Sequence, residues 1–330
     1  MPSSSLDASV FTLDWAREAE RIAGRLRETA RQFRRRGVVV ALSGGVDSSV
    51  CAALAVRALG PAKVFGLLLP EREASARGTA LGRHVAEQLG INYAIQDLTA
   101  VLEALGCYRE RDAAIRRLFP AYGEGWKNKL VIAGGLAGQF NFFKLVVQAP
   151  DGGRAETRLP HAEYLQIVAA QNYKQRLRKT VEYFHADRLH YLVVGTPNRL
   201  EYDQGFFVKQ GDGAADVKPI AHLYKTQVYA LARHLGLPEA ICTAAPTSDT
   251  YSLPQGQEEF FFALPYAQMD LALWAAQHQY PPAALAQALG VSEALAARIY
   301  SDIATKHRAS AYLHAPPIRF TPQFPATAAD

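Results

Sequence analysis

Apolar runs and amphipathic stretches alternate along most of the chain. Four short runs rich in Val, Ile and Leu have the length of buried strands: 38–42, 64–69, 91–95 and 191–196. Stretches with helical apolar spacing lie between or after them, at 49–59, 74–90, 161–187 and 223–236. This alternation predicts an α/β fold, a doubly wound and mostly parallel sheet with helices on both faces.

Two regions interrupt the alternation. Residues 107–160 contain the turn "APDGG" between two strand-like runs, which predicts a hairpin inserted into the α/β domain. After about residue 265 the chain is alanine-rich and helical, and then rich in proline. We therefore expect an α/β domain over 1–265 with an insertion at 107–160, followed by a C-terminal helical extension and tail over 266–330.

The stretch "SGGVDS" at 43–48 connects the first predicted strand to the first helix. A glycine-rich turn at a helix N-terminus presents backbone N–H groups and partial positive charge, which together bind phosphate. Asp47 adds a carboxylate, which suits a phosphate site if Mg²⁺ lies between the two. The spacing matches neither the Walker motif nor the dinucleotide fingerprint. A tight turn without a ligand is the plainer alternative.

Composition narrows the classes of protein. The chain has 330 residues, 49% of them hydrophobic, and a net charge of +5, which permits an anionic substrate without requiring nucleic acid. Its three cysteines fit no metal or disulfide pattern. No stretch has the length of a membrane span and the N-terminus lacks the order of a signal peptide, so we expect a cytoplasmic protein without a membrane partner.

A second motif suggests a different class. Residues 281–303 resemble a helix-turn-helix, but the second of these helices carries one basic residue, Arg298. Phosphate contacts along DNA need more Lys and Arg than this. We therefore expect a packed helical hairpin and no nucleic-acid partner.

The loop at 43–48 resembles the pyrophosphate-binding loop of the adenosine-nucleotide α-hydrolases. In that group the loop holds the β- and γ-phosphates of ATP, AMP passes to an oxygen of the substrate, and a nitrogen nucleophile then displaces AMP. Five further segments resemble those of NAD synthetases in order and spacing: "NYKQRLR" at 172–178, "VVGTPNRLE" at 193–201, "GFFVKQGDGAADVKPI" at 205–220, "LYKTQV" at 223–228 and "APTSDT" at 245–250. Gln175 and Val208 depart from the family pattern.

The resemblance implies a role for particular residues. Asp47 and Lys225 would be catalytic, and Asp47 and Glu201 would bind Mg²⁺. The positions implied to contact ATP are Ser43, Gly44, Gly45, Val46, Asp47, Ser48, Thr196, Lys225 and Thr247. The positions implied to contact the carboxylate substrate are Arg176, Lys209, Asp212, Asp216, Lys306 and His307.

Plainer interpretations exist for several of these residues. Arg176 could be a solvated helix charge and Glu201 a local helix cap. The segment around Lys209 could be only a turn, and Lys306 with His307 could form a solvated helix end.

The resemblance implies ATP-dependent amidation of deamido-NAD through an acyl-adenylate, with ammonia as nitrogen donor and a homodimer as the assembly. The chain is too short for an added amidase domain, so ammonia would be free or supplied by a separate glutaminase. The alternatives are a paralogous amide ligase for another small carboxylic acid and a nucleotide-binding regulator without turnover. Replacing Asp47 by Asn should abolish most turnover and leave the fold intact.

Overall fold

A parallel four-stranded sheet forms the centre of the molecule. The computed structural model describes residues 6–133, 142–247, 251–256, 261 and 264–320. The sheet has the order β3-β2-β1-β7 and all its strand pairs are parallel. Its strands are β1 (Val38–Ala41), β2 (Val64–Leu68), β3 (Asn92–Ile95) and β7 (Leu192–Val194). All four predicted strands and their parallel arrangement are thus confirmed.

Apolar residues on both faces of the sheet explain why the strand sequences are almost uninterrupted runs. Val38 and Val40 pack into a core on one face. Val39 lies between them in sequence and packs with Leu67 and Val193 into a core on the other face. Successive side chains of a strand point to opposite faces of the sheet. Because both faces are buried, each of these positions has to be apolar.

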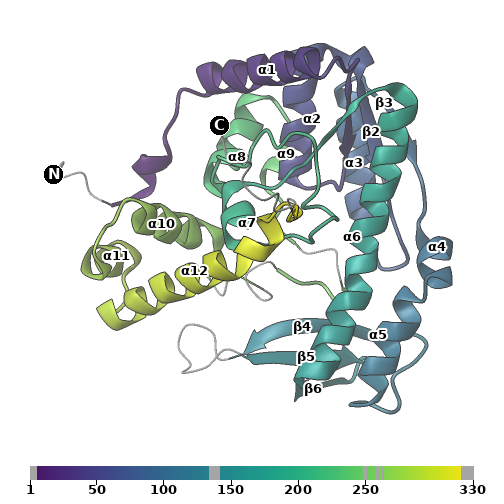
Figure 1. Ribbon diagram of the computed structural model, residues 1–330. Helices are drawn as coiled ribbons and strands as arrows, with labels where there is room; N and C mark the ends of the chain where they lie inside the picture. The colour runs from purple at the N-terminus through teal and green to yellow at the C-terminus, as the bar shows by residue number, and fades with distance from the viewer. Residues whose placement is uncertain (1–5, 134–141, 248–250, 257–260, 262–263, 321–330) are drawn as a thin grey trace, which may run out of the picture.

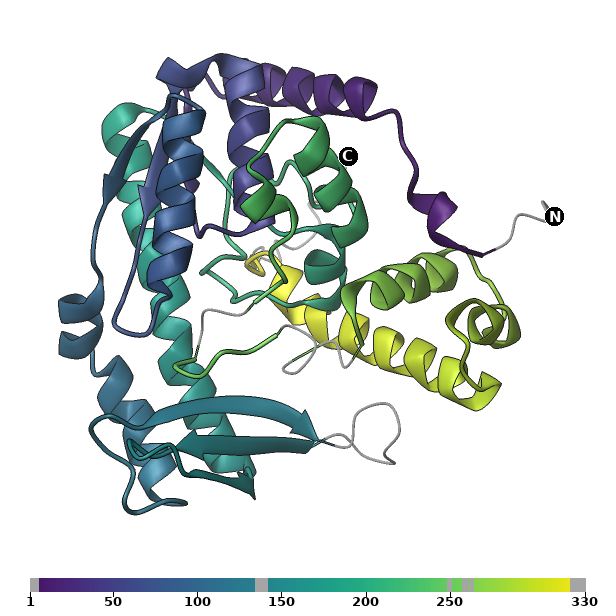
Figure 2. The same ribbon diagram turned by 180° about the vertical axis from the view of Figure 1, so that it is seen from behind.

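Helices cover both faces, as predicted (Figures 1 and 2). On one face, α2 packs at the centre against β1 and β2, with three further helices around it. On the other face, the long helix α6 packs against β1 and β7, beside α4. Their bounds are α1 (Trp15–Gln32), α2 (Val46–Leu59), α3 (Ala76–Gln88) and α8 (Lys225–His234) on the first face, and α4 (Thr99–Ala104) and α6 (His161–Leu189) on the second.

The inserted segment forms a second, antiparallel sheet beside the lower part of α6 (Figure 1). It consists of α5 (Cys107–Arg116) and the strands β4 (Lys127–Ala133), β5 (Phe142–Gln148) and β6 (Arg154–Arg158), in the order β4-β5-β6. The predicted hairpin is β5–β6, and Gly152 takes a left-handed φ of +90° in its turn.

The C-terminal helices share a core of their own with the N-terminal 3-10 turn η1 (Ala8–Phe11). The predicted hairpin at 281–303 is α11 followed by the first half of α12, and their apolar faces meet there. The remaining short elements are η2 (Pro61–Lys63), α7 (Arg199–Gln204) and α9 (Glu239–Cys242), and the extension comprises α10 (Tyr266–Gln277), α11 (Pro282–Leu289) and α12 (Glu293–His314). Among the described residues, no helix combines the length and apolarity needed to cross a membrane.

The strand order places a binding crevice at one point of the sheet. The chain adds β2 and β3 on one side of β1 and later adds β7 on the other side. In open parallel sheets, ligands bind outside the carboxyl ends of the strands where the order reverses in this way. The loops that follow β1 and β7 are therefore the first place to look for a site.

Candidate functional site

The turn after β1 packs directly against helix α3. Gly44 has φ +81°, and a Cβ built on it would lie 2.2 Å from the backbone oxygen of Gly78. Gly82 is equally confined, because its Cβ would lie 2.9 Å from the backbone oxygen of Leu42. Two close backbone approaches thus fix the shape of the turn, and only glycine permits both.

Hydroxyl groups inside the turn hold it together. The Ser48 hydroxyl accepts a hydrogen bond from the Ser43 amide at 3.3 Å and donates to the Gly45 carbonyl at 3.1 Å. Ser49 donates to the same carbonyl at 2.8 Å, and the Ser43 hydroxyl accepts from the Gly45 amide at 3.2 Å. These bonds give the turn a fixed form before any ligand arrives.

Helix α2 begins inside this turn. Its N-cap is Gly45, which offers no side-chain cap, and buried Val46 anchors the first turn in the core. The first N–H groups of a helix have no partner within the helix, and they carry the positive end of its dipole. The start of α2 is therefore suited to phosphate, as the sequence indicated.

Asp47 is the centre of a polar cluster drawn from three elements. Its Oδ1 accepts a hydrogen bond from Asn198 Nδ2 at 3.1 Å, and its Oδ2 pairs with Lys225 Nζ. Asn198 and Glu201 form a capping box at the start of α7, in which Asn198 Oδ1 accepts from the Glu201 amide at 3.1 Å. The structure thus brings together three residues that the sequence assigned to one site, Asp47, Glu201 and Lys225.

The ammonium of Lys225 is buried and stays charged. Burial by itself would lower its pKa, but Asp47 and Glu201 outweigh burial and raise the pKa above its ordinary value. Burial raises the pKa of the nearby Cys51 thiol, and the same two carboxylates raise it further. A permanent cation beside the turn can neutralise developing negative charge on phosphate.

Helix α8 presents Lys225 at its first position, and Asp270 of α10 fixes that end of the helix. Its carboxylate accepts from the Lys225 amide at 3.3 Å, and from the amide and the hydroxyl of Thr226, both at 2.7 Å. Burial raises the pKa of Asp270 to about 6. The C-terminal extension therefore helps to set the position of the catalytic lysine candidate.

The donor set at Asp47 and Glu201 fits Mg²⁺. Both carboxylates act electrostatically on the same ammonium of Lys225, so they lie around one place. Proteins usually hold Mg²⁺ with one or two carboxylates and complete its shell with waters and substrate phosphates. The described residues contain no cluster of three or more His, Cys, Asp or Glu side chains that could hold a metal by itself. Any metal here would need ligands from a bound nucleotide.

Two of the residues assigned to the acceptor, Arg176 and Lys209, are in direct contact. Arg176 of α6 donates from Nε to the backbone oxygen of Lys209 at 3.3 Å. Lys209 Nζ donates to the carbonyls of Tyr312 at 2.7 Å and Ala315 at 3.2 Å, at the end of α12. The contact between Arg176 and Lys209 joins two segments that the sequence predicted to share a substrate.

Asp212 and Asp216 make bonds within the protein. Asp212 Oδ1 accepts from the Val208 amide at 2.8 Å, and burial raises the pKa of this carboxyl group. Asp216 Oδ2 accepts from the Val193 amide of β7 at 2.7 Å, and its Oδ1 accepts from Tyr183 Oη at 3.2 Å. These two carboxylates shape the segment that carries Lys209 and attach it to the sheet.

The remaining predicted residues are placed as follows. Thr196 is half-buried just after β7, while Thr247 is exposed and bridges to Gly256. Lys306 Nζ donates to the Phe261 carbonyl and to Asp302, both at 2.6 Å, and His307 Nδ1 lies 3.3 Å from the Asp203 carbonyl. Lys306 and His307 lie inside α12 and not at its end, and the Lys306 side chain is only 15% exposed, so the expected alternative of a solvated helix end does not describe them. Residues 248–250 of the "APTSDT" segment lie outside the described residues.

Sequence reasoning missed three contributors to this site. Asn198 carries a local signal, because Asn followed by Glu three residues later is a capping box at a helix start. Gly78 and Asp270 carry none, since each acts on a turn or helix that is distant in sequence. Only tertiary contact reveals such residues.

Comparisons with known proteins show the family of this chain. The family model described as NAD synthase matches residues 18–117 and 150–310. The NH(3)-dependent NAD(+) synthetase of Rhizobium meliloti (strain 1021) is 54% identical over 311 residues, which cover 94% of this chain and 93% of the relative. That of Thermotoga maritima is 35% identical over 250 residues, covering 75% of this chain and 83% of the relative. The NH3-dependent NAD synthetase of Campylobacter jejuni shares the fold, with a TM-score of 0.61 at 22% identity over 94% of this chain and all of that one.

Proposed function

This chain belongs to the NAD synthase family, and we propose that it converts deamido-NAD, ATP and ammonia to NAD, AMP and pyrophosphate. The observation that carries this proposal is the cluster of Asp47, Lys225 and Glu201 beside the glycine turn at the start of α2. It combines a phosphate-binding turn, a permanent cation and two carboxylates. The relatives that match nearly the whole chain are named NH(3)-dependent NAD(+) synthetases.

The reaction needs charge control and positioning more than a protein nucleophile. A carboxylate oxygen of deamido-NAD attacks the α-phosphorus of ATP, the bond to the β-phosphate oxygen breaks, and pyrophosphate leaves. Ammonia then attacks the acyl carbon of the adenylate, AMP leaves, and one proton is released. The start of α2 binds phosphate, and Lys225 neutralises charge on the phosphates as the bonds rearrange.

Mg²⁺ is proposed as the metal, held by Asp47 and Glu201 together with phosphate oxygens. When bound, it supplies further charge neutralisation on the departing pyrophosphate. The contact of Asp47 with Lys225 holds its carboxylate next to the turn where the phosphates would lie.

The cysteines support ammonia over glutamine as nitrogen donor. An enzyme that takes its nitrogen from glutamine needs a reactive thiol, and a reactive thiol has a lowered pKa and an accessible position. Cys51, Cys107 and Cys242 are all buried and unpaired, and burial raises the pKa of each, that of Cys107 to about 11. Unpaired cysteines also support a reducing compartment such as the cytoplasm.

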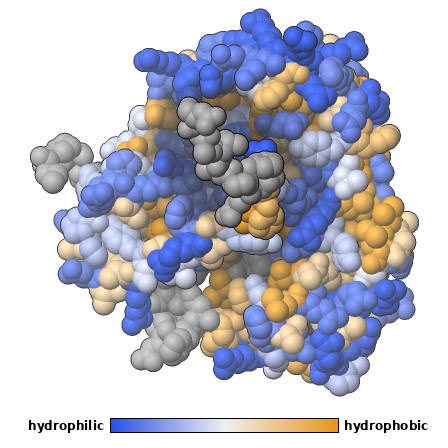
Figure 3. Space-filling model, in the orientation of Figure 1, coloured by the Kyte–Doolittle hydropathy of each residue, from blue (hydrophilic) through white to orange (hydrophobic). Residues whose placement is uncertain are grey.

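We propose a homodimer, supported by exposed apolar residues on α6 and α4. Figure 3 shows apolar side chains gathered on the side of the molecule that carries these helices. The exposed residues are Leu165, Tyr173 and Phe184 on α6, Val101 on α4, and Leu105 directly after α4. Light scattering tests this proposal: Phe184→Glu should yield monomers, while Phe33→Glu, at an exposed phenylalanine after α1, should not.

The reaction is tested by measuring pyrophosphate and NAD together. Purified protein receives Mg-ATP, ammonium and deamido-NAD, with each omitted in turn and glutamine replacing ammonium in one arm. Equal amounts of pyrophosphate and NAD that require all three substrates support the proposal. ATP binding without NAD formation would instead support a ligase for another acid, and NAD formation with glutamine in place of ammonium would contradict the choice of ammonia.

A further inference from the structure

The inserted sheet holds a segment that comes from elsewhere in the chain. The NAD synthase family model leaves residues 118–149 unmatched, and β4 and β5 lie in that stretch. The apolar core beneath the inserted sheet contains Leu130 of β4, Leu145 of β5 and Ile115 of α5. It also contains Tyr251, which follows the insertion by almost a hundred residues. The core of the inserted sheet is therefore completed by a residue from outside the insertion.

Residues 252–255 lie along the edge of β4 that β5 does not occupy. The Ser252 hydroxyl accepts from the Asn128 amide at 2.8 Å, and the Leu253 amide donates to the Asn128 carbonyl at 3.0 Å. Two residues further along β4, Gln255 Nε2 donates to the Leu130 carbonyl. An edge strand leaves a row of N–H and C=O groups unpaired, and this segment satisfies the N–H and C=O of Asn128 and the C=O of Leu130.

The segment leads directly to a residue of the site. Gly256 follows Gln255 and pairs with Thr247 in an isolated antiparallel bridge. The resemblance to NAD synthetases assigns Thr247 to ATP. The edge of β4 is thus connected to Thr247 through the segment it holds and the bridge at Gly256.

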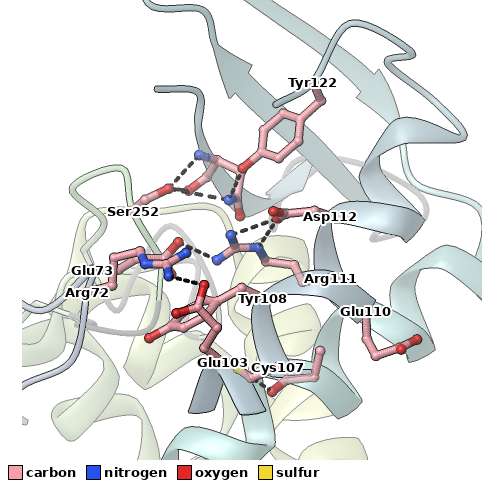
Figure 4. A network of polar contacts seen from close by, with 12 residues as sticks. Arg72, Glu73, Glu103, Cys107, Tyr108, Glu110, Arg111, Asp112, Tyr122 and Ser252 are labelled. Carbon is pink, nitrogen blue, oxygen red and sulfur yellow. Dashed lines mark hydrogen bonds and ion pairs between the residues drawn. The ribbon is translucent and has the colours of Figure 1, made fainter. Parts of the chain in front are cut away.

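Buried ion pairs attach the inserted sheet to the main domain. Arg111 of α5 pairs with Glu73 and, at 2.7 Å, with Asp112. Lys174 of α6 pairs with the same Glu73 at 2.6 Å and with Glu71 at 3.1 Å, after the end of β2. Figure 4 shows Arg111 between Glu73 and Asp112, with Ser252 and Tyr122 on one side of Arg111 and Tyr108 on the other. The pair of Arg111 with Glu73 attaches α5 to the main domain, and α5 shares an apolar core with the inserted sheet.

We propose that the inserted sheet positions Thr247 for ATP, with Ser252 and Gln255 as the positioning residues. The sheet acts as a fixed edge against which residues 252–255 are held, and the bridge at Gly256 transmits that position to Thr247. The inference rests on the proposed function only in that Thr247 contacts ATP. It assigns a role in nucleotide binding to a part of the chain that the family model does not match.

The test uses Ser252→Ala and Gln255→Met in the full-length protein. The first removes the hydroxyl that Asn128 uses, and the second keeps the volume of the side chain but removes the donor to Leu130. Ser252→Thr keeps the hydroxyl and serves as the rescue variant. Gln148→Ala is the matched control, because Gln148 lies in the same inserted sheet and donates at 3.3 Å to the β5–β6 turn.

Three measurements are made on each variant: the Kd for ATP, the KM values with kcat, and hydrogen exchange of the Leu253 amide. We expect each positioning variant to raise the Kd and KM for ATP roughly 2- to 10-fold, as loss of one hydrogen bond predicts. Exchange at Leu253 should quicken, while kcat and the KM for deamido-NAD stay within about twofold of wild type. Ser252→Thr and Gln148→Ala should behave as wild type.

Other results would overturn the proposal. Faster exchange at Leu253 with an unchanged Kd for ATP would show that the held segment does not reach the nucleotide. Unchanged exchange would show that these bonds do not hold the segment. A parallel change of both KM values, kcat and Tm would indicate general destabilisation. Failure of the proposed function is separate, because it appears in the wild type as ATP binding without NAD formation, and the comparison of Kd values still applies there.

Discussion

Replacing Asp47 by Asn tests both the chemistry and the electrostatics of the site. The Asp47 carboxylate serves two donors, Asn198 Nδ2 on one oxygen and Lys225 Nζ on the other. An amide has a single oxygen, so one of the two donors would face an NH₂ group. The Lys225 side chain is only 3% exposed, so water cannot replace the lost partner.

The structure changes the expectation drawn from the sequence, which was loss of turnover without loss of stability. Removing one partner of a buried ion pair typically costs about 3–5 kcal/mol, because the other charge stays buried without compensation. Unfolding entropy is roughly 2.1 cal/mol/K per residue, so for 330 residues that cost lowers Tm by about 4–7 °C. Glu201 still acts on Lys225, which favours the lower part of this range.

The assay compares Asp47→Asn with the double variant Asp47→Asn/Lys225→Met. Thermal unfolding gives Tm for each, and pyrophosphate release gives turnover. We expect the single variant to lose stability and the double variant to recover most of it, because it no longer buries an unpaired ammonium. Turnover should fall by orders of magnitude in both, since both lack the carboxylate proposed for Mg²⁺.

Three results would refute this reasoning. A single variant as stable as wild type would show that Asp47 does not compensate the buried charge of Lys225. Near-normal pyrophosphate release in either variant would remove Asp47 from the catalytic site. If the double variant were no more stable than the single one, the loss of stability would not come from the unpaired ammonium of Lys225.

Three further predictions use the same physical terms. Gly44→Ala should abolish most ATP binding, measured by titration, because its Cβ would lie 2.2 Å from the backbone of α3. Gly90→Ala is the control, since Gly90 has φ +62° but open space around it. That variant should lose only roughly 1 kcal/mol of stability and bind ATP normally. Lys174→Met should lower the free energy of unfolding, measured in urea, by about 3–5 kcal/mol, because it leaves buried carboxylates without their partner. Lys144→Met removes a lysine from an exposed ion pair and should cost less than about 1 kcal/mol. Equal losses in the two variants would contradict the explanation by burial. The pKa of Asp270 is raised from 3.8 to about 6, so protonation favours the folded state; the stability of wild type relative to Asp270→Asn should fall by roughly 3 kcal/mol from pH 4 to above pH 6, and a flat difference in Tm across that range would contradict it.

The order of elements could be read from the sequence because it depends on local pattern. Apolar runs such as 38–42 have the length and β-branched composition of buried strands, and the turn at 43–48 indicates its chemistry through its residue types. The capping box of Asn198 and Glu201 is equally local, although the contact of Asn198 with Asp47 is not. The division of the chain at residue 265 stays a prediction.

Contacts between distant segments could not be read in this way. Gly78 looks like any helical glycine until α3 lies against the turn, and Asp270 looks like a charge in an apolar helix until it caps α8. Lys174 was part of a recognised motif, but its burial between Glu71 and Glu73 gives it a structural role that the motif did not show.

The sequence by itself determined the fold class and predicted the glycine turn and the residue types of the candidate site. It did so because periodicity, turn chemistry and helix caps are properties of neighbouring residues. Only the tertiary structure decided which charges compensate Lys225, which backbone closes on Gly44, and that the inserted sheet holds residues 252–255. The physical reason is that burial and desolvation depend on every segment packed around a group, and a linear pattern does not specify which segments those are.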